Sequence, residues 1–289
     1  MSKFNIYDHI TELFVKSLEK GVVPWQKTWR TGMPRSLRQE YRGVNRFMLL
    51  LVAEDREYVS NLWLTWNDVQ RLGGKVKPHS RSALVTYFKV LQFAGQEEDD
   101  DPRRVPMLRY YKVFNADVVE RLPITTVPTP VEEHQAAGDI LKGYRNAPRV
   151  LHRMSANPRY RPGPDVMELP PAGQFNDVPA YWQTMFHELV HSTGHSSRLK
   201  RWTEGYDHAF GSEDYSKEEL IAELGSAFLM NRVGLESETT HENSAAYLGS
   251  WLRVLKADNR FVYQAASKAQ RAVDYIRGET DPARETPRV

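Results

Sequence analysis

Apolar residues recur at helical spacing in several stretches of the chain, and these stretches predict its helices. In residues 5–20, Ile6, Ile10, Phe14 and Leu18 fall four positions apart, which places them on one face of a helix. Gly21 follows this stretch and is typical of a helix end. The same kind of pattern predicts further helices over residues 45–54, 65–72, 131–144, 177–194, 216–230, 244–257 and 261–275.

Shorter apolar or alternating runs predict strands over residues 62–66, 75–77, 80–90, 109–114, 149–154 and 166–169. The proline-rich segment LPITTVPTP, residues 122–130, blocks helix and ladder continuity and predicts a semi-rigid linker. We therefore expect an α+β protein of two domains. The N-terminal α+β domain covers residues 1–121, and the C-terminal domain, mainly helical with a small sheet, covers 131–277. A disordered tail follows at 278–289.

Composition narrows the possible chemistry. The chain of 289 residues has no cysteine, which excludes disulfides, thiolate metal ligands and a cysteine nucleophile. No apolar stretch reaches transmembrane length, so we expect no membrane partner. The N-terminal sequence MSKFNIYDHI lacks the apolar region of a signal peptide. These features predict a cytoplasmic protein.

The helix predicted at 177–194 contains the string HELVH, which suggests a metal site. His187 and His191 lie four residues apart, so both imidazoles project from one helical face. Two such imidazoles suit Zn²⁺, although Mn²⁺ and Co²⁺ also accept nitrogen and carboxylate ligands. Glu188 lies beside the first histidine and could act as general base toward a water molecule. The alternative is an accidental string on an amphipathic helix.

A third metal ligand is needed, and three residues are candidates. His195 lies one turn beyond the pair, but Gly194 interrupts the helix there, and the metzincin string is excluded because Ser197 occupies its last histidine position. Glu219 and Glu223 share one face of the helix predicted at 216–230. Their spacing resembles the E-x-x-x-[DE] pattern of glutamate zincins, in which the first carboxylate binds the metal and the second orients a histidine.

That resemblance favours Glu219 as ligand and Glu223 as its support, but a second interpretation remains open. Ser216 and Glu219 also match a capping box, in which Glu219 would bond back to the helix start and leave Glu223 as the ligand. Tyr215, just before this helix, is a candidate to hydrogen-bond a tetrahedral intermediate, although a packing role is the alternative. In zincins an edge strand pairs with the substrate, and we expect the strand at 166–169 to do so here.

Charge and aromatic residues give the N-terminal half a different character. Residues 1–90 hold 15 Lys/Arg and 8 Asp/Glu, which is an excess of positive charge. Single-stranded DNA is bound by cations that replace counterions and by rings on which bases stack. The candidate DNA-binding residues are Trp25, Lys27, Trp29, Arg30, Arg35, Arg38, Tyr41, Arg42, Asn45, Arg46, Trp66, Lys75 and Lys77, with Trp63 and Tyr87 as further rings. For each one, a core or solvated position is the alternative.

Taken together, these motifs resemble those of the ArdC-type antirestriction proteins of conjugative plasmids. The matching N-terminal segments are KGVVPWQKTW, PRS…YRGVN, LTWNDVQRLGG and VFNADVV, and the C-terminal ones are HELVHSTGH and EELIAELGSAFL. They span nearly the whole chain. The N-terminal module also resembles one attached to some plasmid primases. The acidic run Glu97–Asp101 has no clear counterpart in the family pattern.

The resemblance implies an N-terminal domain that binds single-stranded DNA and a C-terminal zincin-like metallopeptidase domain. It also implies a role in protecting incoming plasmid DNA from host restriction. A peptidase recruited to DNA, with a host restriction-system protein as substrate, is one hypothesis. A second hypothesis is a DNA-coating protein whose metal domain is structural or regulatory. A third is a peptidase that binds RNA or another polyanion.

Overall fold

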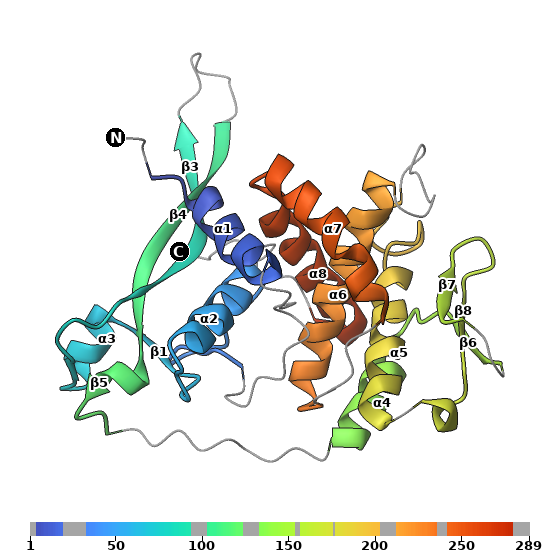
Figure 1. Cartoon of the computed structure of the whole chain (residues 1–289), viewed down its shortest axis with the longest axis horizontal. Helices are drawn as coiled ribbons and strands as arrows, with labels where there is room; N and C mark the ends of the chain where they lie inside the picture. Colours follow the sequence, from blue (N-terminus) through green and yellow to red (C-terminus); the bar gives the residue numbers. More distant parts are fainter. Residues whose placement is uncertain are drawn as a thin grey trace. The chain divides into compact units, whose positions relative to one another are not determined.

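The computed structural model describes residues 4–19, 33–93, 103–123, 133–153, 157–175, 177–202, 212–235 and 242–279. Its contacts divide the chain into two compact units. Figure 1 shows the chain coloured along its sequence, with most helices and strands labelled. Residues 33–41 and 45–127 form one unit, and residues 1–32, 42–44 and 128–289 form the other. The acidic run Glu97–Asp101, most of the predicted linker and most of the predicted tail lie outside the described residues.

The first of these units, here called the hairpin unit, is built on a long antiparallel hairpin. Strands β3 (Ala83–Phe93) and β4 (Arg103–Asn115) pair along their length, and β1 (Trp63–Thr65) pairs with the end of β4. The strand order is therefore β1-β4-β3. β4 is longer than the sequence predicts, since it runs through Pro106. β1 pairs only with the last three residues of β4, so one side of β4 is open at Pro106, where a missing N–H is tolerated.

Two helices and a small second sheet complete the hairpin unit. Helix α2 (Val44–Asp55) packs its apolar residues, including Leu49, on the base of the hairpin and on Trp63. Helix α3 (Trp66–Arg71) starts at a capping box in which Thr65 and Asp68 bond each other's backbone. The short strands β2 (Lys75–Val76) and β5 (Val119–Glu120) pair with each other, and the one-turn helix η1 (Ala116–Val118) precedes β5.

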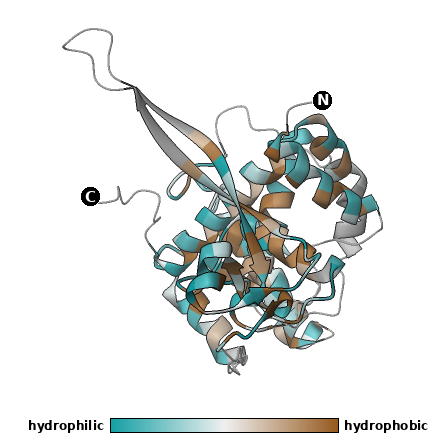
Figure 2. Ribbon diagram, turned by 90° about the vertical axis from the view of Figure 1, so that its left-hand side faces the viewer, coloured by the Kyte–Doolittle hydropathy of each residue, from teal (hydrophilic) through white to brown (hydrophobic). Residues whose placement is uncertain are grey.

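The other unit, here called the helical unit, combines six helices with a three-stranded sheet among its described residues. The helices are α1 (Ile6–Glu19), α4 (Glu133–Gly143), α5 (Val178–Ser192), α6 (Glu213–Arg232), α7 (Glu242–Ala257) and α8 (Phe261–Arg277). Helices α5, α6, α7 and α8 form the centre of the unit, and α1 packs on them. The sheet contains β6 (Arg149–His152), β7 (Arg159–Arg161) and β8 (Val166–Leu169), and the one-turn helix η2 (Ala172–Gln174) leads into α5. Brown and teal segments alternate along these helices in Figure 2, as amphipathic packing requires.

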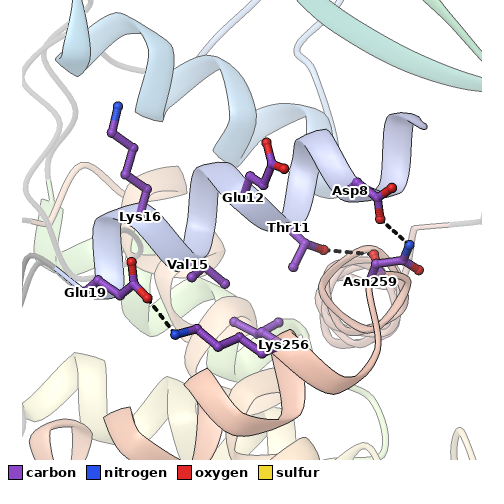
Figure 3. Close-up of a pocket in the computed structure, with 9 residues that line it drawn as sticks. Asp8, Thr11, Glu12, Val15, Lys16, Glu19, Lys256 and Asn259 are labelled. Carbon is purple, nitrogen blue, oxygen red and sulfur yellow. Dashed lines mark hydrogen bonds and ion pairs between the residues drawn. The ribbon is translucent and has the colours of Figure 1, made fainter. Parts of the chain in front are cut away.

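Helix α1 differs from the expected domain division. Its apolar stripe, which includes Ile10 and Phe14, is buried, and the helix packs against α7 and α8. Figure 3 shows the polar contacts that flank this packing: Thr11 donates to the Asn259 carbonyl at 2.8 Å, and Lys256 pairs with Glu19 at 2.6 Å. The first helix of the chain therefore joins the C-terminal helices, because they cover its apolar face, and the boundary at residue 121 does not separate it from them.

The small sheet also corrects an expectation. β8 is the central strand, paired in parallel with β6 and antiparallel with β7, so residues 166–169 do not form the sheet edge. The edge beside α5 is β7, whose sequence Arg-Tyr-Arg has too little apolar pattern to predict a strand. The α+β fold class in two parts is confirmed. No described helix is both long and apolar enough to span a membrane.

Candidate metal centre and nucleic-acid interface

Helix α5 presents the two histidines of HELVH on one face. Asp177 caps its start by accepting from the Ala180 backbone N–H at 2.6 Å, and Pro179 lies in the first turn, where its missing N–H has no helical partner to lose. From this helix the Nε2 atoms of His187 and His191 meet at 3.0 Å. Both residues are half-buried. Two ring nitrogens that converge on one point form an arrangement that a cation would stabilise.

Helix α6 brings a carboxylate to the same point. Glu219 has one oxygen 3.4 Å from His187 Nε2 and the other 3.4 Å from His191 Nε2. The close approach of the two helices depends on Gly225, because a Cβ there would lie 2.7 Å from a methyl group of Val190. Among the described residues, the three side chains form the cluster whose ligand atoms could hold a metal ion. This donor set of two imidazoles and a carboxylate fits a divalent cation.

The start of α6 shows how Glu219 and Glu223 lie relative to the histidines. The helix begins at Glu213, and Ser212 is its N-cap, with its hydroxyl accepting from the Tyr215 N–H at 3.1 Å. Ser216 is therefore already inside the helix, and the alternative capping box with Glu219 does not form. Glu223 lies on the far side of the first histidine, 3.5 Å from His187 Nδ1. It occupies the place of a residue that orients the imidazole.

A matching support for the second histidine was not predicted from the sequence. Glu218 lies 3.5 Å from His191 Nδ1 and is held by Arg201, whose guanidinium contacts it at 2.5 and 3.0 Å. Arg201 also donates to the Val190 carbonyl and to the Thr193 hydroxyl, which fixes it to the end of α5. The available signal was the run of carboxylates in an otherwise apolar, buried helix, since buried charges require partners.

Burial and mutual charge set the proton affinities in this cluster. Burial disfavours the charged form of each histidine and so lowers its pKa, but the negative charge of Glu219 outweighs burial at both histidines. The pKa of His187 is therefore raised. The pKa of His191 is raised well above its usual value, because Glu218 also contacts this imidazole. Burial opposes ionisation of Glu219, yet the two histidines hold its pKa far below normal. Despite its burial, Glu218 has a pKa lowered to about 2, mainly by Arg201.

Glu188 is buried beside the two histidines. Desolvation raises the pKa of its carboxyl group, while the neighbouring histidines and a hydrogen bond from the Tyr160 backbone lower it in part. This carboxyl group accordingly binds a proton more readily than an exposed glutamate does. A raised pKa suits a group that takes up a proton and releases it again. Tyr160 belongs to β7, so the sheet edge runs directly past Glu188.

The two remaining candidates of this region lie differently. Tyr215 is half-buried in the first turn of α6, four residues before Glu219 and on the same helical stripe as Glu219 and Glu223. His195 does not join the cluster. Its Nδ1 lies 2.7 Å from the Ser197 hydroxyl and accepts the Ser197 backbone N–H, because the chain turns after α5. Gly194 in this turn packs against the Trp202 indole, 2.8 Å from where a Cβ would lie.

Several predicted DNA-binding residues serve internal contacts instead. Tyr41 and Arg46 are buried, and Arg46 donates to the Tyr41 carbonyl at 3.3 Å. The side-chain amide of Asn45 bonds both the N–H and the carbonyl of Thr86, and so covers the main chain of edge strand β3. Arg42 pairs with Asp274. These polar groups are therefore already used within the fold, and contact of the four residues with DNA stays a prediction.

Other candidates remain at the surface. Arg35, Arg38, Lys75 and Lys77 are exposed, and Lys77 donates to the Asp117 carbonyl at 2.8 Å. Trp66 is 54% exposed and packs edge-on against Phe114, whereas Trp63 is buried in the core. Trp25, Lys27, Trp29 and Arg30 lie outside the described residues.

The hairpin carries Tyr87, which the sequence named as a candidate ring, and further exposed rings that the sequence did not single out. Tyr111 on β4 lies beside Tyr87 on β3, with ring centroids 5.9 Å apart, and Phe88 and Tyr110 are exposed on the opposite face of the ladder. The hydroxyl group of buried Tyr41 is hydrogen-bonded to the Tyr111 hydroxyl, so Tyr41 supports an exposed ring. Exposed Arg109 and Lys112 flank the two tyrosines of β4. Rings interleaved with positive charge can bind single-stranded nucleic acid.

Two family models match the chain and agree with the two kinds of site. The model of the N-terminal domain of anti-restriction factor ArdC matches residues 4–114. The model of the zincin-like metallopeptidase matches residues 145–268, which include both histidines and Glu219.

Among curated proteins, the chain is similar to DNA primase TraC of Escherichia coli, at 29% identity over 93% of this chain and 27% of the primase. The chain thus spans about a quarter of that primase's length. It is also similar to an uncharacterised protein of Sinorhizobium fredii, at 28% identity over 96% of this chain and 94% of that protein.

Solved structures extend the likeness to the whole chain. The metal-free crystal structure of the antirestriction ArdC protein from plasmid R388 matches with a TM-score of 0.80 and 32% identity, over 96% of this chain and 100% of that one. The Mn(II)-bound crystal structure of the same protein matches with a TM-score of 0.80 over 95% and 98%. With both domain models and this full-length likeness in agreement, the chain belongs to the family of ArdC antirestriction proteins.

Proposed function

We propose that this protein is a metal-dependent peptidase that acts in antirestriction and is recruited to single-stranded DNA. The observation that carries the proposal is the convergence of His187, His191 and Glu219 on one point, with buried Glu188 beside them. The solved relative binds Mn(II), which supports a divalent cation at this place. His187, His191 and Glu219 would hold it, and Zn²⁺, Mn²⁺ and Co²⁺ all accept this donor set.

The protein's own residues have separable roles in this proposal. When bound, the cation would supply a Lewis acid that polarises the scissile carbonyl. Glu188 takes a proton from the attacking water and passes it to the leaving amine, as its raised pKa allows. Glu223 and Glu218 keep the two imidazoles in position from their Nδ1 sides. Tyr215 donates a hydrogen bond to the developing oxyanion, a role consistent with its place on the Glu219 stripe.

The test of catalysis is Glu188→Gln, which keeps the shape of the side chain and removes its basicity. We expect normal folding and metal binding but a loss of peptide cleavage of about 10²–10⁴-fold. The screen would use restriction-enzyme subunits as substrates, with and without single-stranded DNA. Glu213→Gln is the matched control, because this carboxylate is exposed on α6 and pairs with Lys217 on the surface of that helix. Unchanged cleavage by Glu188→Gln would remove the catalytic claim.

A second candidate function is favoured by the exposed rings of the hairpin. Tyr87 and Tyr111 offer a stacking surface that requires no metal. The protein would then coat incoming DNA, and its metal domain would be structural or regulatory. Under this function Glu188→Gln retains full antirestriction activity, whereas Tyr87→Ala with Arg109→Gln lowers it. The opposite pattern in a plasmid-transfer assay supports the peptidase.

A further inference from the structure

An arginine-rich face lies on the small sheet beside the candidate metal centre. Arg159 and Arg161 project from β7, and Arg153 follows β6; their guanidinium groups lie 2.8, 3.3 and 3.7 Å from the Glu168 carboxylate of β8. The Glu168 side chain is only 4% exposed, while the three arginine side chains are 50–62% exposed. Three cations therefore share one buried carboxylate, and unbalanced positive charge faces solvent.

The edge of this sheet runs past Glu188. Within the described residues β7 pairs only with β8, so its other side has no strand partner. The backbone N–H of Tyr160, the middle residue of β7, bonds the Glu188 carboxylate. Side chains alternate along a strand, so Arg159 and Arg161 project from the face opposite the Tyr160 ring, which packs on Trp202 at 5.4 Å.

An extended peptide that added to this edge, with one of its carbonyl groups taking the Tyr160 N–H in place of Glu188, would place alternate side chains next to the two arginines. Charge complementarity then selects carboxylates, because the guanidinium fork matches a carboxylate in planar geometry. A nucleic acid fits less well. By the strand register this face of β6, β7 and β8 carries Arg149, Leu151, Val166 and Glu168 besides the two arginines, and none of these strand residues is aromatic, in contrast to the hairpin.

We propose that Arg159 and Arg161 form a specificity surface for acidic peptide segments, which are bound along β7 and so delivered to the metal centre. The inference rests on the proposed peptidase function, whose substrate class it specifies. Each arginine contributes through a partly exposed ion pair, so its removal is expected to weaken binding by about two- to fivefold. The buried Glu168 competes with the peptide carboxylates for the same guanidinium groups.

The experiment measures binding apart from cleavage. Full-length Glu188→Gln protein is titrated into a fluorescein-labelled octapeptide in which glutamate alternates with valine, and into the same peptide with glutamine or lysine in place of glutamate. We expect the glutamate peptide to bind at least about tenfold more tightly than the glutamine peptide at low salt. Equal binding of the glutamate and glutamine peptides overturns the proposal.

Two variants of opposite sign separate recognition from general damage. In the Glu188→Gln background, Arg161→Gln should weaken binding of the glutamate peptide, and Glu168→Gln should strengthen it by freeing the arginines. A purely structural role of the cluster predicts weaker binding in both, and that result contradicts the proposal. Arg145→Gln is the charge-matched control for Arg161→Gln, since Arg145 is exposed in the same unit outside the sheet. Thermal unfolding checks that each variant is folded.

Further arms keep the two proposals distinct. If labelled oligothymidylate loses as much affinity as the glutamate peptide on Arg161→Gln, the face binds nucleic acid and the peptide proposal is overturned. Selective binding of the acidic peptide with no cleavage by the wild-type protein supports the surface and removes the peptidase function. Metal-dependent cleavage of peptides without any preference for acidic residues supports the peptidase function and overturns the proposed specificity surface.

Discussion

The candidate metal centre and the candidate DNA surface use polar side chains in opposite ways. In the metal centre each imidazole is held between Glu219 and a supporting carboxylate, and nearly every group is buried. On the hairpin the rings and cations are exposed and repeated along two strands. The first site depends on a few positions fixed by helix packing, whereas the second distributes its contacts over many. Single substitutions should therefore affect the first site far more than the second.

The largest effect is expected for Glu219→Ala, which removes the only carboxylate that contacts both Nε2 atoms among the described residues. Its loss should lower Zn²⁺ or Mn²⁺ affinity by more than the 10–100-fold typical of a supporting residue. Isothermal titration calorimetry of the two cations measures this, with Glu213→Gln as control. If Glu223→Ala is the more damaging of the two, the ligand assignment is reversed.

Glu218→Gln tests the support of the second histidine. It removes the charge that contacts His191 Nδ1 and leaves Arg201 buried without its carboxylate partner. We expect a loss of metal affinity of about 10–100-fold. Folding is monitored by circular dichroism, because a buried arginine without its partner also lowers the free energy of unfolding. Unaltered metal affinity in a folded variant would limit Glu218 to a structural role.

On the hairpin, Tyr111→Ala removes one of two adjacent exposed rings. Stacking of about 1–3 kcal/mol per base predicts that affinity for oligothymidylate falls by about tenfold. Tyr41→Phe should have a smaller effect, since it removes only the hydroxyl that positions Tyr111. Phe4→Ala, an exposed ring of the other unit, is the control in the same fluorescence anisotropy assay. A loss caused by Phe4→Ala but not by Tyr111→Ala would place the DNA surface elsewhere.

An ion pair beside the metal centre should give a pH-dependent stability. Arg198 is almost fully buried and donates to Asp165 at 2.8 Å. Burial raises the pKa of Asp165, but the contacts with Arg198 and with the Tyr160 hydroxyl outweigh burial, so the pKa of Asp165 is lowered. A lowered carboxyl pKa contributes stability that is present above the unfolded value near 4 and is lost as pH falls through the folded value. Asp165→Asn should cost about 1–2 kcal/mol at pH 7 and reduce the acid dependence of chemical denaturation. An unchanged acid profile contradicts this assignment.

The smallest effect is expected for a single surface cation. Lys75→Gln removes an exposed charge of the hairpin unit and should weaken DNA binding by no more than a fewfold, while lowering the salt dependence by about one released counterion. Affinity for oligothymidylate at several salt concentrations measures both quantities. An effect as large as that of Glu219→Ala on metal binding would remove the contrast between a concentrated and a distributed site.

Local patterns were sufficient for the helices and for much of the metal centre. The stripe of α1 and the HELVH face of α5 are properties of residues a few positions apart, and the structure has both. Tyr41, Asn45 and Arg46 show the limit of this reasoning. Their residue types suit DNA binding, but type does not tell which side chains the fold buries, and the core and edge strand β3 use all three.

The sequence by itself determined the α+β class, the paired histidines with Glu188, and the helix that carries the third ligand candidate. Only the tertiary structure decided that Glu219 faces both Nε2 atoms, that Glu218 and Arg201 support His191, and that β7 forms the sheet edge beside Glu188. The physical reason is the separation along the chain of the residues that must come together. Helical spacing fixes which residues share a face, whereas contacts between α5, α6 and the sheet depend on packing, such as Gly225 against Val190, between segments far apart in the chain.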